Sequence, residues 1–178
     1  MSRANDFIFM GLKIVTWIIF VGLCIEAGGL LVNFAFSLFK PEMVSRLYQK
    51  LDLSEMYERS RFVYFSMYSF AISIALLKAV LFYIMVMLVS KISLSQPFSR
   101  FASKQITHLS YYTFSIGLLS YIAQRSAKEL VKRGYNIDIL DQFWADSQAF
   151  ILMAAVIYVI ALIFSKGVEI QTENELTV

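Results

Sequence analysis

Four apolar segments constrain this chain more than any other feature of its sequence. They cover approximately residues 14–39, 62–89, 106–123 and 149–164. A bilayer core of about 30 Å is crossed by a helix of roughly 20 mostly apolar residues. Because unpaired backbone groups are costly in lipid, each segment is expected to be one continuous helix. The sequence therefore predicts an all-α, integral membrane protein that crosses the bilayer four times.

The composition is that of a chain surrounded by the apolar interior of a membrane. Hydrophobic residues make up 58% of the 178 residues and charged residues 16%, whereas a soluble domain has about half and about a quarter. The first apolar segment is too long for a signal peptide and contains Glu26, so we expect it to be retained in the membrane. The whole chain, residues 1–178, is predicted to form one transmembrane domain with the fold of an antiparallel four-helix bundle.

The connections between the segments carry local signals. In residues 42–51 the apolar side chains recur at helical spacing, which predicts a short amphipathic helix at the membrane surface. Asp52 and Glu55 resemble a capping box that opens the second helix. The third segment continues without a helix breaker as far as Arg133, and Gly134 is well placed to cap it. The third helix is therefore expected to extend beyond the bilayer.

Two charged residues, Glu26 and Lys78, lie near the middle of the first and second segments. An isolated charge at that depth costs about 3 kcal/mol or more. If both helices are centred in the bilayer and antiparallel, the two side chains differ in depth by roughly 5 Å. The pair is either a structural salt bridge that fixes helix packing, or a functional group such as an ion relay, a proton relay or a ligand counter-ion.

Polar side chains of the first and third segments are candidates for a cavity inside the bundle. Gly22, Glu26, Gly29 and Asn33 share one face of the first helix, which favours close packing of another helix. The hydroxyl groups of the third segment need partners in lipid, and they either line a polar cavity or bond back to their own helix. The cavity candidates are Asn33, His108, Tyr111, Tyr112, Ser115 and Gln124.

No catalytic motif is recognisable, and we expect a protein that is not an enzyme. The chain has no nucleophile elbow, phosphate loop or HExxH pair. One histidine and one cysteine, His108 and Cys24, exclude a multi-cysteine metal site and a bis-histidine haem within one chain. No metal and no cofactor are therefore expected. A net charge of +3 gives no basis for direct binding of nucleic acid.

The C-terminal tail, residues 165–178, is acidic and ends in a β-prone Leu-Thr-Val. A free end of this kind can add a strand to the sheet of a partner or dock by its carboxylate. The alternative is a frayed terminus. The candidate partner-binding residues are Glu173, Glu175, Leu176, Thr177 and Val178.

Two stretches, Ser95-Gln96-Pro97-Phe98 and the ending IFSKGVEIQTENELTV, resemble the membrane family catalogued as DUF2975. The resemblance rests mainly on Gly167, Glu173 and the final Leu-Thr-Val, supported by Pro97 and Phe98. It implies a four-helix membrane protein of unknown activity, often encoded beside a small helix-turn-helix regulator of the Cro/C1 type. Such a protein would hold or release the regulator through a cytoplasmic tail.

The resulting functional hypothesis is a non-enzymatic membrane sensor or anchor for a cytoplasmic transcription regulator. The alternative is a small transporter or channel subunit with a polar intramembrane path. Lys and Arg are more numerous in the first and third connections, which weakly favours termini outside. The resemblance implies the opposite, with both termini in the cytoplasm and the protein in a bacterial inner (cytoplasmic) membrane. Membrane lipid is the expected partner, and the sequence leaves open whether the chain forms homo-oligomers.

Overall fold

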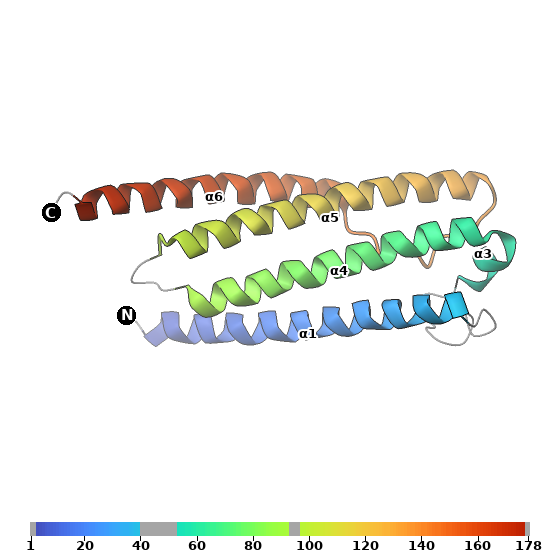
Figure 1. The fold of residues 1–178 in the computed structure, drawn as a ribbon, viewed down its shortest axis with the longest axis horizontal. Coiled ribbons are helices and arrows are strands. Elements are labelled where there is room, and N and C mark those ends of the chain that lie inside the picture. Colours follow the sequence, from blue (N-terminus) through green and yellow to red (C-terminus); the bar gives the residue numbers. More distant parts are fainter. Residues whose placement is uncertain (1–2, 40–52, 93–96, 177–178) are drawn as a thin grey trace.

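The computed structural model describes residues 3–39, 53–92 and 97–176, and within these ranges the chain is helical and contains no strand. The long helices, in chain order, are α1 (Arg3–Phe39), α4 (Arg61–Lys91), α5 (Arg100–Lys132) and α6 (Ser147–Leu176). A short helix, α3 (Ser54–Arg59), precedes α4. Figure 1 shows the four long helices side by side, with both ends of the chain near the same end of the molecule.

Three of the long helices are long and apolar enough to cross a membrane: Phe7–Phe39 in α1, Arg61–Lys91 in α4 and Ser147–Asn174 in α6. In the most apolar part of α1 only 6% of the residues are buried, and in that of α6 only 17%, as expected for helices that face lipid. The predicted third crossing, residues 106–123, lies within α5, whose polar side chains lower its hydropathy. That crossing stays a prediction.

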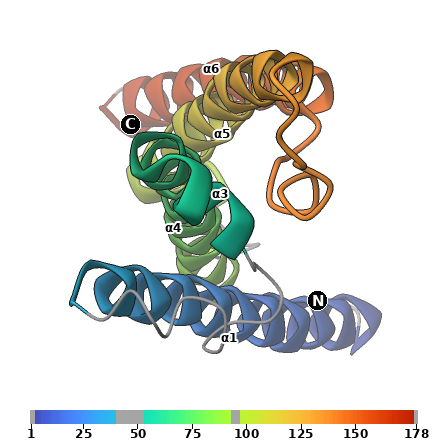
Figure 2. The same ribbon diagram turned by 90° about the vertical axis from the view of Figure 1, so that its right-hand side faces the viewer.

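Each long helix packs mainly against its neighbours in the chain. Helix α4 contacts α1 on one side and α5 on the other, and α5 packs against α6. Figure 2, which looks along the helices, shows α4 between α1 and the α5–α6 pair. The described helices therefore form an open row in which α1 and α6 make no extensive contact, and the predicted antiparallel four-helix bundle is not confirmed.

A buried stripe with coiled-coil spacing runs the full length of α5. Its members recur alternately four and three positions apart, and they are Ala102, Ile106, Leu109, Thr113, Ile116, Ser120, Ala123, Ala127 and Leu130. A repeat of 3.5 residues keeps one seam of a helix against its neighbour. Towards α6, a Cβ added to Gly117 would lie 2.9 Å from the side chain of Ile151, so glycine permits the close approach of these two helices.

The start of the second long helix differs from the sequence prediction. Helix α4 begins at Arg61, and the hydroxyl of Ser60 accepts a hydrogen bond from the backbone N–H of Val63. The short helix α3 opens at Leu53 without any side-chain cap. Ser60 thus caps the second long helix, which the sequence predicts to open at Asp52 and Glu55. Asp52 lies outside the described residues. The predicted surface helix at residues 42–51 lies outside the described residues.

The C-terminal ends of α5 and α6 are both defined by the structure. Helix α5 ends at Lys132, and Gly134 follows with a φ of 75°, which confirms it as the residue that terminates the helix. Helix α6 continues without a break to Leu176, so residues 165–176 are helical. The last two residues, Thr177 and Val178, lie outside the described part of the chain. The acidic segment is thus an extension of a membrane helix for most of its length.

Candidate functional site

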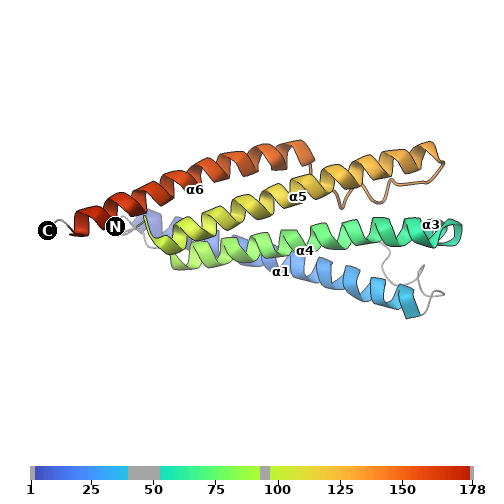
Figure 3. The same cartoon turned by 45° about the horizontal axis from the view of Figure 1, so that its top comes forward.

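The third connection, residues 133–146, is folded against the helices, and we call it the inner loop. Figure 3 shows this segment running back alongside α5 from the end of that helix to the start of α6. Leu140, Phe143, Trp144 and Ala145 are buried and belong to the same hydrophobic cluster as residues of α4 and α5. Backbone groups of a buried loop need hydrogen-bond partners. Three helices supply them here.

Lys78 holds the inner loop from α4. Its ammonium group donates a hydrogen bond to the backbone carbonyl of Phe143 at 3.3 Å, and its side chain is half-buried. Glu26 is half-buried on α1, and its charge acts on Lys78. Among the described residues no ion pair joins the two. Lys78 therefore interacts directly with the loop, and with the carboxylate only at a longer distance.

Gln124 and Ser120 hold the inner loop from α5. The amide nitrogen of Gln124 donates to the carbonyl of Ala145 at 3.1 Å, and its amide oxygen accepts from the hydroxyl of Ser147 at 3.2 Å. The hydroxyl of Ser120 accepts from the backbone N–H of Ala145 at 3.2 Å. Ser120, Ala145 and Ser147 are buried. This network joins α5, the inner loop and the first residue of α6.

Arg59 fixes the other end of the inner loop from α3. Its two terminal nitrogens donate to the carbonyls of Arg133 and Gly134, both at 2.7 Å. Its guanidinium also lies over the ring of Tyr135, 4.1 Å from the centroid. The last carbonyls of a helix lack partners within the helix, and a planar guanidinium can satisfy two of them at once. Helix α3 thus acts as a cap on the C-terminal end of α5.

One buried polar group of the inner loop has no hydrogen-bond partner among the described residues. It is the indole nitrogen of Trp144. A buried donor without an acceptor costs about 1–3 kcal/mol.

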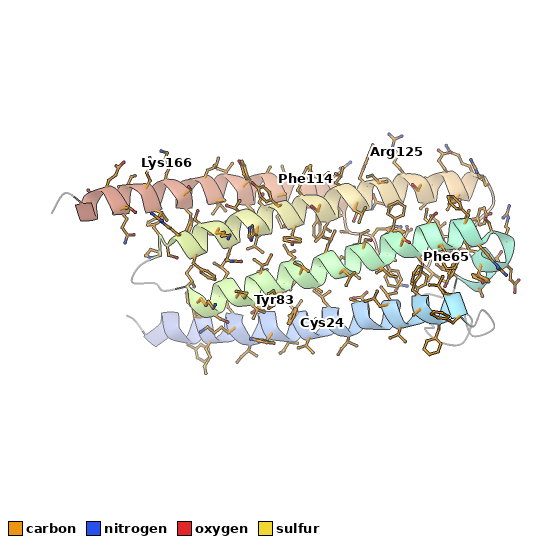
Figure 4. The ribbon with its side chains drawn as sticks, in the orientation of Figure 1. Cys24, Phe65, Tyr83, Phe114, Arg125 and Lys166 are labelled. Atoms are coloured by element: carbon orange, nitrogen blue, oxygen red, sulfur yellow. The ribbon has the colours of Figure 1, made fainter. Side chains whose placement is uncertain are left out.

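The predicted cavity residue on α1, Asn33, lies in a different environment. It is buried, and its amide nitrogen donates to the hydroxyl of Tyr68 on α4 at 3.0 Å, while its amide oxygen has no hydrogen-bond partner in the described part of the chain. The rings of Phe34 and Tyr64 lie 5.5 Å and 5.4 Å from that of Tyr68, and further aromatic pairs join α4 to α1 along its length. Figure 4 labels Phe65 and Tyr83, which point from α4 towards α1, where their rings lie 5.7 Å from Phe34 and 5.8 Å from Phe20.

The predicted cavity residues on α5 are also dispersed. The hydroxyl of Ser115 donates to the carbonyl of Tyr111 in its own helix at 2.9 Å. The exposed ring of Tyr111 lies 6.4 Å from that of Tyr158 on α6. His108 and Tyr112 are half-buried on α5. Of the α5 candidates, Gln124 alone has a described hydrogen bond to the inner loop.

The charged and acidic candidates do not form a metal cluster. Within the ranges that the structure describes, no three His, Cys, Asp or Glu side chains lie close enough to hold a metal ion. On the predicted tail, Glu173 is exposed on α6, and Glu175 and Leu176 belong to the last turn of that helix. These residues lie at the end of the molecule opposite to the inner loop (Figure 1).

Sequence reasoning missed the residues that make the inner loop a buried element. Arg59 and Phe143 were not candidates, and Ser120 was considered only as one of the hydroxyls of the third segment. Each contact joins a side chain to the backbone of a distant residue. One signal was present in the sequence. The connection contains large apolar residues that a solvated loop does not need, namely Ile137, Ile139, Leu140, Phe143 and Trp144.

A family model described as "Protein of unknown function (DUF2975)" matches residues 46–178. The matched part contains the inner loop together with Arg59, Lys78 and Gln124, which hold it, whereas α1 with Glu26 and Asn33 precedes it. No curated protein and no solved structure matches the chain.

Proposed function

The chain belongs to the DUF2975 family of proteins of unknown function, and from this premise we propose that it is a non-enzymatic membrane sensor and anchor for a cytoplasmic transcription regulator. One observation carries the proposal. A buried loop is held at one end of the molecule by a few hydrogen bonds, among them the bond from Lys78 to Phe143. The helical C-terminal segment of α6 lies at the opposite end.

The proposed embedding is four antiparallel crossings of a bacterial inner (cytoplasmic) membrane with both termini in the cytoplasm. Three crossings are the apolar helices α1, α4 and α6. The more polar α5 is suited to the fourth because α4 and α6 pack on it and its hydroxyls are largely bonded within protein. Thr107, Thr113 and Ser115 donate to carbonyls of α5 itself, and Ser110 donates to Ala154 on α6.

The proposed mechanism is a shift between two arrangements of the inner loop. In one, Lys78 binds the carbonyl of Phe143. In the other, the loop moves away and Lys78 turns to the carboxylate of Glu26. The electrostatic attraction between Glu26 and Lys78, which form no ion pair in the described arrangement, supports a second arrangement in which they meet.

The contact between α5 and α6 is the proposed route to the cytoplasm. Gln124 on α5 is bonded to the first residue of α6, Gly117 lies against Ile151, and Ser110 is bonded to Ala154. A displacement of the inner loop would therefore displace the start of α6 as well. Because helices transmit displacements as rigid bodies, the C-terminal end of α6 would move with it. The regulator would be held by that end, around Glu173.

Retention of the regulator on membranes tests the function. The helix-turn-helix protein encoded nearest to the gene is co-expressed with the full-length chain, with a chain lacking residues 173–178, and with Lys78→Met. We expect the full-length chain to retain the regulator, the truncated chain to release it, and Lys78→Met to change the retained fraction. Lys132→Met, an exposed change on α5, is the control. Equal retention by all four chains would refute the anchor function.

A further inference from the structure

An open groove of about 1020 Å³ lies along α6 at the end of the molecule that carries the termini. Its lining includes Phe98, from the segment before α5, and Leu162, Ile163, Lys166, Gly167 and Ile170 of α6. The lining is mostly apolar, and Lys166 is its charged member. The position of the groove is separate from the inner loop, so it is a second feature of the fold.

The groove exists because Phe98 lies directly over a glycine. A Cβ added to Gly167 would stand 2.8 Å from two ring atoms of Phe98, a distance that side chains do not tolerate. The ring is also 5.3 Å from the ring of Phe164, centroid to centroid. Phe98 thus forms one wall, and the absence of a side chain at Gly167 lets the ring of Phe98 rest against the backbone of α6. The two stretches of sequence that carry the family resemblance meet at this contact.

The groove is continuous with the surface of α6 that is proposed to face lipid. Leu162 and Ile163 belong to the candidate span of α6, and their side chains are 51% and 59% exposed. A crossing of roughly 20 residues that starts near Ser147 ends close to Lys166 and Gly167. The apolar part of the groove is therefore in hydrocarbon, and its charged part is at the level of lipid headgroups.

Lys166 is the feature that selects one kind of lipid. Its side chain is 72% exposed and forms an ion pair with Glu169 one turn further along. Figure 4 shows Lys166 pointing outward from α6. A lysine at the end of a membrane helix lays its stem along apolar surface and places its charge among the headgroups. A phosphate at that level would be attracted to it.

We propose that this groove binds one anionic phospholipid of the leaflet on the side of the termini, with an acyl chain against Phe98 and Ile163 and the phosphate at Lys166. The proposal rests on the proposed membrane embedding of α6 but requires no regulator. An apolar chain fits the apolar lining beside Phe98, Leu162 and Ile163, and the ammonium of Lys166 complements the phosphate. Glu169 competes with the phosphate for that ammonium, which gives the site a built-in opposing charge.

The headgroup contact is tested on the purified full-length protein in detergent, with equal amounts of phosphatidylglycerol and phosphatidylcholine and native mass spectrometry as the readout. We expect the wild type to retain phosphatidylglycerol about fivefold better. Lys166→Gln should abolish this preference, and Glu169→Gln should increase it. Lys132→Gln, which removes an exposed ion-paired lysine at the other end of the molecule, should leave it unchanged. A wild-type preference in Lys166→Gln would overturn the proposal.

The acyl-chain contact is tested by Gly167→Leu, whose side chain takes the place of the Phe98 ring and pushes that ring into the groove. We expect retention of both lipids to fall several-fold while the helical circular dichroism stays that of the wild type. Normal lipid retention together with loss of the regulator would identify the groove as a protein-docking surface and overturn the proposal. If Gly167→Leu does not fold, the two surface variants at Lys166 and Glu169 still decide the question. Lipid binding is measured without the regulator, so failure here is distinct from failure of the anchor function.

Discussion

The ammonium group of Lys78 on α4 is hydrogen-bonded to the backbone carbonyl of Phe143, 65 positions further along the chain. A lysine within a membrane helix pairs either with a carboxylate or with a backbone carbonyl. For Lys78 the direct partner is a backbone carbonyl of the inner loop, and Glu26 acts from a longer distance. The bond makes the position of the loop depend on one charged side chain. Five predictions concern the contacts that hold the loop and the helices together.

Replacing Lys78 by Met should loosen the inner loop without unfolding the helices. A hydrogen bond from a charged group contributes about 1.5–3 kcal/mol, so hydrogen-exchange protection of residues 137–146 should fall roughly 10- to 100-fold. Glu26→Gln should leave this protection equal or higher, because it removes the competitor for Lys78. Lys91→Met, at the exposed end of α4, is the control. Equal loss of protection in the Glu26 and Lys78 variants would show that the carboxylate holds the lysine in place.

Gln124→Ala should lower the stability of the protein in detergent by about 2 kcal/mol. The substitution removes two hydrogen bonds and leaves the carbonyl of Ala145 buried without its donor. Ser115→Ala is the matched control, because the hydroxyl of Ser115 bonds only within its own helix. We expect the control to change stability by less than about 0.5 kcal/mol. Thermal unfolding followed by circular dichroism distinguishes the two, and equal effects would contradict the role of Gln124.

The contact between Asn33 and Tyr68 should behave as a coupled pair. Tyr68→Phe leaves the buried amide of Asn33 without its acceptor and should cost about 1–2 kcal/mol of unfolding free energy. Asn33→Leu should then have a smaller effect in the Tyr68→Phe background than in the wild type. The double-mutant cycle is measured by denaturant unfolding in mixed micelles. Additive effects of the two substitutions would show that the hydrogen bond contributes nothing to the packing of α1 on α4.

Arg59→Lys should expose the junction between α5 and the inner loop to protease. A lysine cannot satisfy the carbonyls of both Arg133 and Gly134, nor stack in the same way on Tyr135. Tryptic cleavage after Lys132 and Arg133 should therefore become several-fold faster than in the wild type. Arg61→Lys keeps the same cleavage sites and serves as the control. Unchanged cleavage in the Arg59 variant would mean that the end of α5 is held by other contacts.

Gly134→Ala provides an independent disturbance of the same junction. The positive φ of 75° costs an L-residue about 1 kcal/mol. We expect faster cleavage at the same two sites and a small decrease in melting temperature. A variant carrying both Gly134→Ala and Arg59→Lys should be cleaved no more slowly than either single variant, since both changes weaken one structural element.

The sequence by itself determined the elements and their environment. The apolar segments at residues 14–39, 62–89 and 149–164 each lie within a long helix that can cross a membrane. Gly134 marked the end of the third helix, and the motifs at Phe98 and Gly167 indicated the family. These features are local, because helix formation, termination and hydropathy depend on residues within a few turns of one another.

Only the tertiary structure decided which residues meet. The sequence paired Lys78 with Glu26 from their depth in the membrane, but depth does not specify the distance across the space between two helices. The inner loop packs against α4 and supplies the nearer acceptor, at Phe143. The same holds for Phe98 and Gly167, which come together because α5 and α6 pack closely. A periodic pattern specifies which face of a helix is buried, whereas the partner of that face depends on how all the helices pack together.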